Sequence, residues 1–365
     1  MNTIDMSLPA PISGACVWHG RDIANSSRWI RDFTPAMLDE IEQALRGVQK
    51  RGLAWHQVTR ADFEIPRTAA LLAEAAEELE NGSGMMKLRG IPVAKYSEDE
   101  LRILWFGLGA VLARPLFQNR SGELMRAIRD EGGDLGKRYG QIEKGDDKPF
   151  ISSYARTLSS GALRYHTDRC DVVGLLCVRQ ARAGGVSTLA SSPAVHNAML
   201  ERRPDLAAAL YEPIWRSRLG EELGGEKIAY PLPIFGQRDG RFTSHYSLTY
   251  IEAAQLMDDV PRLTALQREA IDMLMKLCAE LSFEMTMEPG VIQLLNNHVI
   301  YHGRTPFTDD ATTGNDRLLL RLWLGMPNSR ALPEDHAPLW GNVAAGTPHG
   351  GIGQANAAYD KIRAS

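Results

Sequence analysis

The spacing of the histidines is the first feature that could carry chemistry. Among nine histidines in 365 residues, only His166 has an acidic residue two positions later, in His166-Thr167-Asp168. Residues i and i+2 of an extended segment face the same side, so this imidazole and this carboxylate can converge on one ion. Two imidazoles and one carboxylate on one face of an octahedron bind non-haem Fe(II). The pattern therefore predicts a third ligand from a distant histidine.

His302 is the best candidate for that third ligand. It follows the mostly apolar segment 291–295 and precedes Gly303, a residue type that lets backbones approach closely. His298 competes with it, because two strand residues four positions apart point the same way. His298 could equally be a hydrogen-bonded structural histidine. A lone His-x-Asp also occurs as a surface pair or in a core, so the metal site is a hypothesis at this point.

Two arginines share one face of a late apolar segment. Residues 317–324 read Arg-Leu-Leu-Leu-Arg-Leu-Trp-Leu, and in a strand the even positions form an all-leucine face. Arg317 and Arg321 lie on the other face, where a buried guanidinium is costly unless it is paired. A carboxylate is its natural bidentate partner. That partner is either a structural acidic residue or the far carboxylate of a dicarboxylic co-substrate. Both readings can hold together, with one arginine bound to each kind of carboxylate.

The surrounding pattern indicates how these residues are positioned. Helical periodicity predicts helices over 36–51, 67–80, 97–113, 193–210 and 263–281, the last with an apolar stripe from Leu266 to Leu277. After about residue 150, short apolar runs at 172–178, 187–190, 291–295 and 318–324 alternate with Gly and Pro breaks, as in an antiparallel jelly roll. We expect an α+β, mainly β fold in three parts. These are a mostly helical segment 1–120, a β core with helical insertions over 121–335, and a tail 336–365 that wraps the surface or a neighbouring subunit.

The composition excludes several classes of protein. A net charge of -4 without a long basic run argues against a nucleic-acid partner. No apolar run is long enough to cross a membrane, and the first twenty residues lack the features of a signal peptide. The four cysteines are scattered, which favours reduced thiols and a cytoplasmic location. The expected partner is a small-molecule substrate, and a homo-oligomer remains possible.

Taken together, the motifs resemble the taurine-dioxygenase-like (clavaminate-synthase-like) branch of the Fe(II)/2-oxoglutarate oxygenases. The resemblance covers residues 150–330 and is carried by Tyr165–Asp168, Gly184–Thr188, Asn297, His302–Arg304, and Arg317 with Arg321. It implies a double-stranded β-helix with flanking helices, and iron held by His166, Asp168 and His302. It also implies that Arg317 or Arg321 binds the far carboxylate of 2-oxoglutarate, with a contact from either Ser187 or Thr188. Ser187 fits better by its distance from the glycines.

The resemblance also implies a reaction. The cofactor is Fe(II), the co-substrates are 2-oxoglutarate and O2, and an unactivated C–H is oxidised with release of succinate and CO2. Because Asp168 keeps the carboxylate that halogenating members lack, hydroxylation or a related oxidation is expected. Asn297 and Arg304 are candidates to support the metal ligands, or they simply hold the turn around His302.

The substrate is the least defined part of the prediction. Substrate contacts are expected from loops near His166 and from the odd-numbered face of the strand expected over 317–324, called the arginine strand below. The candidates are Asn119, Arg120, Tyr154, Tyr246 and Trp323. Arg120 or Arg321 could bind an anionic group. The alternatives are a non-catalytic jelly-roll protein that binds a metal or ligand, and a hydrolase. The hydrolase is weak, because the chain has no Gly-x-Ser-x-Gly, His-Glu-x-x-His or phosphate-loop motif.

Overall fold

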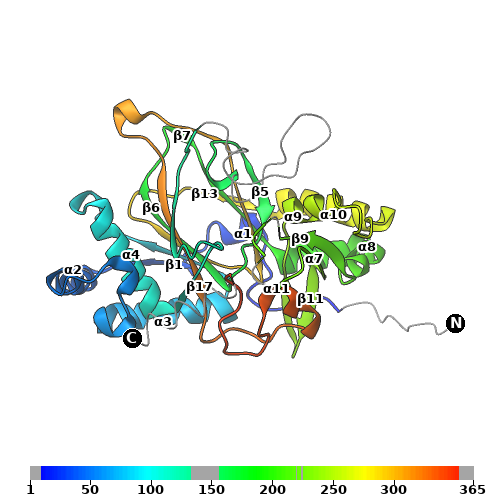
Figure 1. Cartoon of the computed structure of the whole chain (residues 1–365), viewed down its shortest axis with the longest axis horizontal. Coiled ribbons are helices and arrows are strands. Elements are labelled where there is room, and N and C mark those ends of the chain that lie inside the picture. Colours follow the sequence, from blue (N-terminus) through cyan, green and yellow to red (C-terminus); the bar gives the residue numbers. More distant parts are fainter. Residues whose placement is uncertain (1–9, 133–155, 219, 223–224, 353–365) are drawn as a thin grey trace.

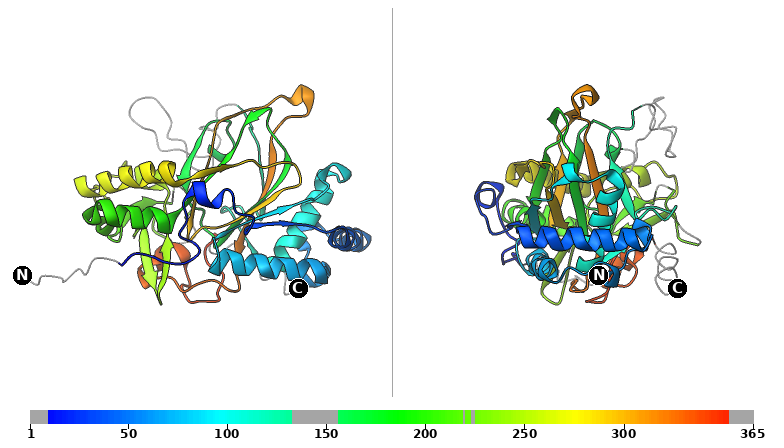
Figure 2. Two further views of the ribbon diagram at one scale, coloured as in Figure 1. Left: turned by 180° about the vertical axis from the view of Figure 1, so that it is seen from behind. Right: turned by 90° about the vertical axis from the view of Figure 1, so that its left-hand side faces the viewer.

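Two β-sheets face each other at the centre of the molecule, and helices cover both outer faces (Figures 1 and 2). The structure is a computed structural model that describes residues 10–132, 156–218, 220–222 and 225–352. The sheets pair far-separated segments of the chain, as in the double-stranded β-helix that the resemblance implied. The predicted α+β fold class with a jelly-roll core is thus confirmed.

The major sheet carries the arginine strand. Its order is β1-β2-β14-β6-β17-β3, with β4 also paired to β17, and only β1 and β2 run parallel. The central strand β6 (Val172–Arg179) pairs with β14 (Ile292–Asn296) on one side and with β17 (Leu318–Gly325) on the other. The remaining strands are β1 (Ile30–Asp32), β2 (Met85–Arg89), β3 (Arg114–Leu116) and β4 (Met125–Ile128). Strands β2 and β3 thus bring residues before 120 into the major sheet.

The minor sheet carries both metal-binding histidine candidates. Its order is β13-β8-β15-β5, all antiparallel. The strands are β5 (Leu163–His166), β8 (Ser187–Ser191), β13 (Phe283–Met285) and β15 (Ile300–Arg304). A short pair, β7 (Ala183–Gly184) with β16 (Phe307–Thr308), extends beyond it.

Three N-terminal helices cover the outer face of the major sheet. They are α2 (Pro35–Lys50), α3 (Pro66–Asn81) and α4 (Glu98–Leu112), close to the ranges that periodicity predicted. A capping box starts α4, with the Ser97 side chain accepting from the Glu100 backbone N–H. The leucines Leu318, Leu320, Leu322 and Leu324 of β17 pack against these helices in one buried cluster. The even face of the arginine strand therefore points to the helices, as predicted.

A second helical layer covers the minor sheet and corrects two expectations. The single helix expected over 193–210 is two helices, α7 (Ser192–Arg202) and α8 (Pro204–Ala209). Pro204 has no N–H to continue the first helix, so it starts the second one. The helix expected over 263–281 is α10 (Ala265–Leu281), but Leu266 at its start is 41% exposed, and Ala270, Leu274 and Leu277 carry the buried face.

The space between the sheets is an apolar core. Met85, Val173, Leu319 and Trp323 from the major sheet meet Leu189, Met285 and Ile300 from the minor sheet. The described chain also forms the short helices α1 (Gly20–Ile23), α9 (Leu248–Ala254) and α11 (Ala337–Trp340), and two hairpins. The hairpins are β9 (Ile214–Ser217) with β10 (Ala229–Leu232), and β11 (Phe235–Arg238) with β12 (Arg241–Ser244). The described tail, up to residue 352, packs on this same chain through Leu332, Leu339, Trp340 and Val343.

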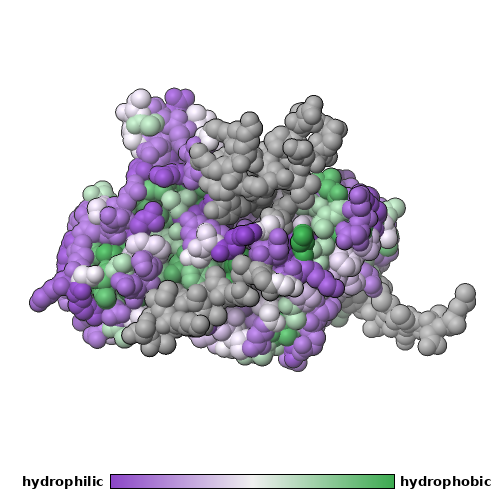
Figure 3. Space-filling model, in the orientation of Figure 1, coloured by the Kyte–Doolittle hydropathy of each residue, from purple (hydrophilic) through white to green (hydrophobic). Residues whose placement is uncertain are grey.

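The described surface is mostly polar. The face shown in Figure 3 is largely polar, with apolar patches that are small and scattered. Among the described residues, Ile228 and Leu266 are the large hydrophobic side chains that are exposed. No helix in the described part of the chain is long and apolar enough to cross a membrane.

Candidate metal centre and its two cavities

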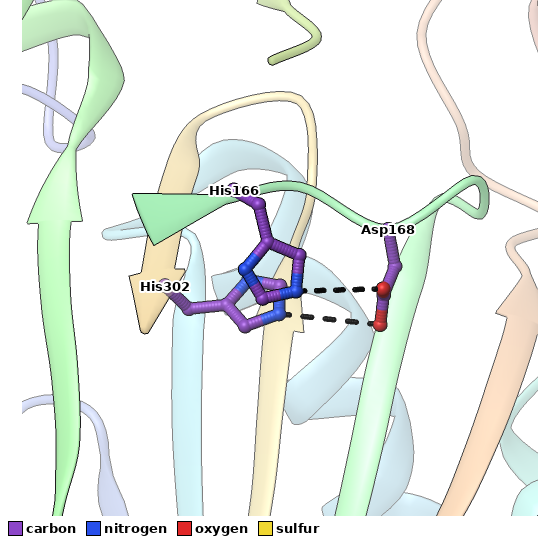
Figure 4. A group of neighbouring side chains, drawn as sticks. All are labelled: His166, Asp168 and His302. Carbon is purple, nitrogen blue, oxygen red and sulfur yellow. Dashed lines mark ion pairs between the residues drawn. The ribbon is translucent and has the colours of Figure 1, made fainter. Parts of the chain in front are cut away.

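His166, Asp168 and His302 converge on one point between the sheets (Figure 4). His166 Nε2 lies 3.7 Å from Asp168 Oδ1, and His302 Nε2 lies 3.9 Å from Asp168 Oδ2. The imidazole centroids are 4.3 Å apart. One ligand atom from each residue lies within 4.8 Å of the other two, and all three residues are buried. This arrangement can hold a single metal ion with a carboxylate and two imidazoles.

Strand register explains why these residues meet. His166 ends β5 and lies directly opposite His302 on β15. The neighbouring Gly303 permits this pairing, because a Cβ there would lie 2.8 Å from the Leu163 carbonyl oxygen. Asp168 lies in the connection from β5 to β6, where its backbone N–H donates to Asn297 Oδ1 at 2.9 Å. Asn297 thus holds the loop that presents the carboxylate.

The protonation states suit metal binding. Burial lowers the pKa of His166, and burial with the neighbouring His166 lowers the pKa of His302 to about 3, so both imidazoles are neutral. The His166 Nδ1–H donates to the Arg164 carbonyl at 2.9 Å, which leaves the Nε2 lone pair directed to the site. Burial alone would raise the pKa of Asp168, but Arg321 and the two imidazoles outweigh it and lower that pKa. The carboxylate is therefore ionised.

A second buried cluster contains the competing histidine. His298 Nε2 and His349 Nδ1 donate to Asp171 Oδ1 at 2.9 and 2.8 Å. The other ring nitrogens are also engaged, since Thr243 Oγ1 lies 2.9 Å from His298 Nδ1 and the Ala344 carbonyl lies 3.1 Å from His349 Nε2. This network anchors the C-terminal segment to the start of β6, and each of its ring nitrogens already has a hydrogen-bond partner, although the three residues also lie close enough together to hold a metal ion. His298 therefore points away from the first cluster.

A cavity adjoins His166, Asp168 and His302 on the side of the strand that carries Arg317 and Arg321. Arg317, Ser187 and Gln293 line it. Arg317 is 6% exposed, and its Nη1 has no hydrogen-bond partner among the described residues. The buried Gln293 Nε2 has none there either. Buried donors of this kind need an acceptor that the protein does not supply. Thr188 is not among the lining residues, and its hydroxyl lies on the Gly303 side of β8.

Arg321 and Trp323 instead support the carboxylate. Arg321 Nε donates to Gln118 Oε1 at 2.7 Å, and its Nη1 lies 3.5 Å from Asp168 Oδ2. Trp323 Nε1 donates to the same Asp168 oxygen at 3.1 Å. The two arginines therefore differ: Arg321 is engaged by the protein, and Arg317 retains an unpaired donor.

A second cavity also adjoins His166 and Asp168 and shares no other lining residue with the first. Trp323 borders it, as expected for a substrate contact, and the remaining lining is rich in hydrogen-bond donors. These donors belong to Arg169, Ser217, Arg218, Tyr230, His245, Ser247 and Tyr250. One acidic residue, Glu221, also lines it, and burial raises the pKa of its carboxyl to about 7.

Three of the expected substrate contacts lie elsewhere. Asn119 caps its own turn, its Oδ1 accepting from the backbone N–H groups of Ser121 and Glu123. Arg120 is exposed and donates to the Gly220 carbonyl. Tyr246 packs in the core under the minor sheet, whereas its neighbour His245 lines the cavity. Tyr154 lies outside the described residues.

Several lining residues were missed by the sequence analysis. Gln293 carried a usable signal, because it is a polar residue inside the apolar run 291–295. Arg169 directly follows the His-x-Asp tripeptide, but a single arginine next to a motif indicates nothing by itself. Arg218 and His245 carried no local signal, since their position depends on how the hairpins pack below the sheets. Arg304, proposed as a support, lines the first cavity and donates to the Ser159 carbonyl.

The fold and this site together define a double-stranded β-helix protein with a facial metal-binding triad, and comparison with known proteins gives the family. Residues 49–323 match the family described as "Taurine catabolism dioxygenase TauD, TfdA family". FR-33289 synthase from Streptomyces rubellomurinus is 30% identical over 349 residues, covering 93% of this chain and 98% of its own. The taurine hydroxylase-like protein SAT17 from Stachybotrys chartarum is 27% identical, and the match covers 87% of this chain and 80% of SAT17.

Solved structures agree on the fold. Asparagine oxygenase has a TM-score of 0.62 at 16% identity and covers 88% of this chain and 99% of its own. The non-heme iron oxygenase OrfP, solved with Fe and alpha-ketoglutaric acid, has a TM-score of 0.56 at 16% identity. The match covers 81% of this chain and 93% of OrfP. The chain belongs to the TauD/TfdA family of Fe(II)- and 2-oxoglutarate-dependent dioxygenases, which confirms the expected family, reaction class and cofactors.

Proposed function

We propose that His166, Asp168 and His302 are the iron ligands of this dioxygenase. The convergence of two neutral imidazoles and one ionised carboxylate on a buried point carries the proposal. Bound iron would supply a Lewis acid with open positions for a 2-oxo acid and dioxygen. Asn297 holds the Asp168 backbone, and Trp323 and Arg321 orient its carboxylate, so these three residues keep the ligand in place.

The first cavity is proposed to bind 2-oxoglutarate, with Arg317 holding the far carboxylate. Arg317 is favoured over Arg321 because its buried Nη1 has no acceptor, whereas Arg321 is already engaged by Gln118 and Asp168. Ser187 is favoured over Thr188 because its side chain lines this cavity. The unpaired Gln293 Nε2 adds a third donor for the same co-substrate.

The second cavity is proposed to bind the molecule that is oxidised. It shares His166 and Asp168 with the first cavity, so a C–H placed there would lie beside the metal ligands. Hydroxylation by an enzyme of the EC 1.14.11 type is the expected outcome. It agrees with two fold relatives, an asparagine oxygenase solved with 3-hydroxyasparagine and OrfP solved with (3S)-hydroxy-L-Arg.

Release of succinate tests this function. Protein loaded with Fe(II) is incubated with 2-oxoglutarate and O2, and succinate is measured with and without candidate substrates. We expect succinate formation that needs both Fe(II) and O2 and that Asp168→Ala abolishes. If the loaded protein binds small molecules and turns over no 2-oxoglutarate, the alternative of a non-catalytic jelly-roll protein replaces the proposal. A homo-oligomeric state and a cytoplasmic location stay predictions.

A further inference from the structure

The backbone immediately after Asp168 is paired with the C-terminal end of the described chain. The Arg169 carbonyl accepts from the Gly351 backbone N–H at 2.8 Å. The next residue, Cys170, forms an antiparallel bridge with Gly350. Two consecutive residues beside the carboxylate of the candidate metal centre are therefore held by a segment from the far end of the sequence.

His349 fastens that segment to the next residue, Asp171. Its backbone N–H donates to Asp171 Oδ2 at 3.1 Å, and its ring Nδ1 donates to Asp171 Oδ1 at 2.8 Å. The His349 side chain is fully buried, and its Nε2 lies 3.1 Å from the Ala344 carbonyl, so the ring has a partner on both sides. We call residues 349–352 the C-terminal strap.

The C-terminal strap lies too close to the metal-binding segment for a side chain to fit between them. Gly350 has a φ of +84°, which L-residues rarely adopt, and a Cβ built on it would lie 2.3 Å from the Arg169 carbonyl oxygen. A methyl group at this position would therefore push the strap and the metal-binding segment apart.

Asn297 holds the same segment from a different element. Its Oδ1 accepts from the Asp168 backbone N–H at 2.9 Å, and its Nδ2 donates to the Cys170 carbonyl at 3.0 Å. Its own backbone N–H donates to the Asp171 carbonyl at 2.9 Å. The match to the family ends at residue 323, so Asn297 lies within the matched range and the C-terminal strap lies beyond it.

We propose that the C-terminal strap, fastened by His349, positions Asp168 for the metal. The inference rests on the proposed function, because that function makes Asp168 an iron ligand. His349 lines neither cavity, so it is a positioning residue that acts through Asp171 and the backbone of 169–171. Residues that orient a metal ligand in this way raise metal affinity, and their loss costs about ten- to a hundred-fold.

Iron affinity, measured beside the stability of the metal-free protein, tests the proposal. The full chain and its variants are compared by anaerobic equilibrium dialysis with Fe(II) and by urea unfolding without metal. His349→Leu is expected to bind Fe(II) about ten- to a hundred-fold more weakly than the wild type. His349→Asn can keep an N–H donor near the place of Nδ1, so it should recover most of that loss. The proposal is wrong if His349→Leu binds Fe(II) as tightly as the wild type.

Two other buried histidines are matched controls. His298→Ala removes a donor to the same Asp171 oxygen but leaves the C-terminal strap paired with 169–171. His336→Leu removes a fully buried ring from the same C-terminal part of the chain. Both variants should keep their iron. A loss of iron in either control as large as that in His349→Leu would be general damage to the fold and would overturn the proposal.

A pair of glycine variants covers the case in which His349→Leu does not fold. Gly350→Ala places a Cβ against the Arg169 carbonyl, whereas a Cβ at Gly346, which also has a positive φ, has its nearest neighbour at 3.5 Å. Amide hydrogen exchange of the metal-free protein over 168–171 should be faster in Gly350→Ala than in Gly346→Ala. Fe(II) should also bind more weakly to Gly350→Ala. Equal exchange in the two variants, or faster exchange with unchanged iron affinity, would contradict a positioning role.

The wild type separates this inference from the proposed function. If the wild type binds no Fe(II), the proposed ligand set fails, and the positioning role fails with it. If the wild type binds Fe(II) and forms succinate while the variants at 349 and 350 bind iron equally well, the proposed function stands and only this inference fails.

Discussion

Replacement of Arg317 by methionine should weaken 2-oxoglutarate binding far more than the same change at Arg321. Arg317 is 6% exposed and its Nη1 has no acceptor in the protein, so a bound carboxylate would be its buried partner. Removing one member of a buried charge pair costs about 3–5 kcal/mol. At about 1.4 kcal/mol for each factor of ten, the dissociation constant should rise by a factor of about 100 to 4,000.

The assay is an anaerobic titration that does not depend on the unknown substrate. Fe(II)-loaded protein is titrated with 2-oxoglutarate, and the weak visible metal-to-ligand charge-transfer band is followed to saturation. Arg317→Lys keeps the charge but loses the planar fork, and about a tenfold weakening is expected. Arg321→Met should weaken 2-oxoglutarate binding less than about tenfold, because Arg321 is engaged by Gln118 and Asp168. An unchanged titration in Arg317→Met, with a large shift in Arg321→Met, would refute this reasoning.

Three further predictions follow from the structure. His302→Ala should lower Fe(II) affinity at least about 100-fold in equilibrium dialysis. His298→Ala should keep its iron, because the native His298 ring contacts Asp171 and Thr243 instead. A larger loss of iron in His298→Ala than in His302→Ala would contradict the ligand set. Burial lowers the pKa of His336 to about 3, whereas the unfolded chain has a value of about 6.5. As the pH falls below about 6.5, the unfolded chain takes up a proton at His336 that the folded chain excludes, so the free energy of unfolding decreases. His336→Leu should flatten the stability curve from urea unfolding between pH 6.5 and 4 by about 1.4 kcal/mol per pH unit, and curves parallel to the wild type would contradict this. Gly290→Ala should destabilise the protein by at least about 2 kcal/mol more than Gly240→Ala. Both glycines have positive φ, but only a Cβ at 290 would meet a backbone oxygen, that of Ile91 at 2.1 Å. Equal losses of stability in thermal unfolding would count against that contact.

The sequence predicted what local periodicity controls. The i, i+2 spacing of His166 and Asp168 and the alternating faces of 317–324 are properties of extended backbone, and both persist in the structure. Helices α2, α3 and α4 appeared within one residue of the expected ends at most positions, because their caps and apolar stripes are local. The break at Pro204 was also visible in the sequence and should have divided the expected helix.

What depends on long-range packing could not be predicted. His298 and His302 look equivalent in the sequence, and only the turn between β14 and β15 directs His298 to Asp171. The roles expected for Tyr246 and Asn119 failed for the same reason, since hairpin orientation and turn capping fix these side chains. Arg218 joins Arg169 only through the packing of the β9 hairpin beside the metal-binding segment.

A crystal structure of the complex with Fe(II) and 2-oxoglutarate, grown without oxygen, tests the central claim most directly. The account predicts one iron bonded to His166 Nε2, His302 Nε2 and an oxygen of Asp168, with the far carboxylate of the keto acid on Arg317. An iron bound at Asp171, His298 and His349 instead, or a keto acid in the cavity of Arg169 and Arg218, would contradict it.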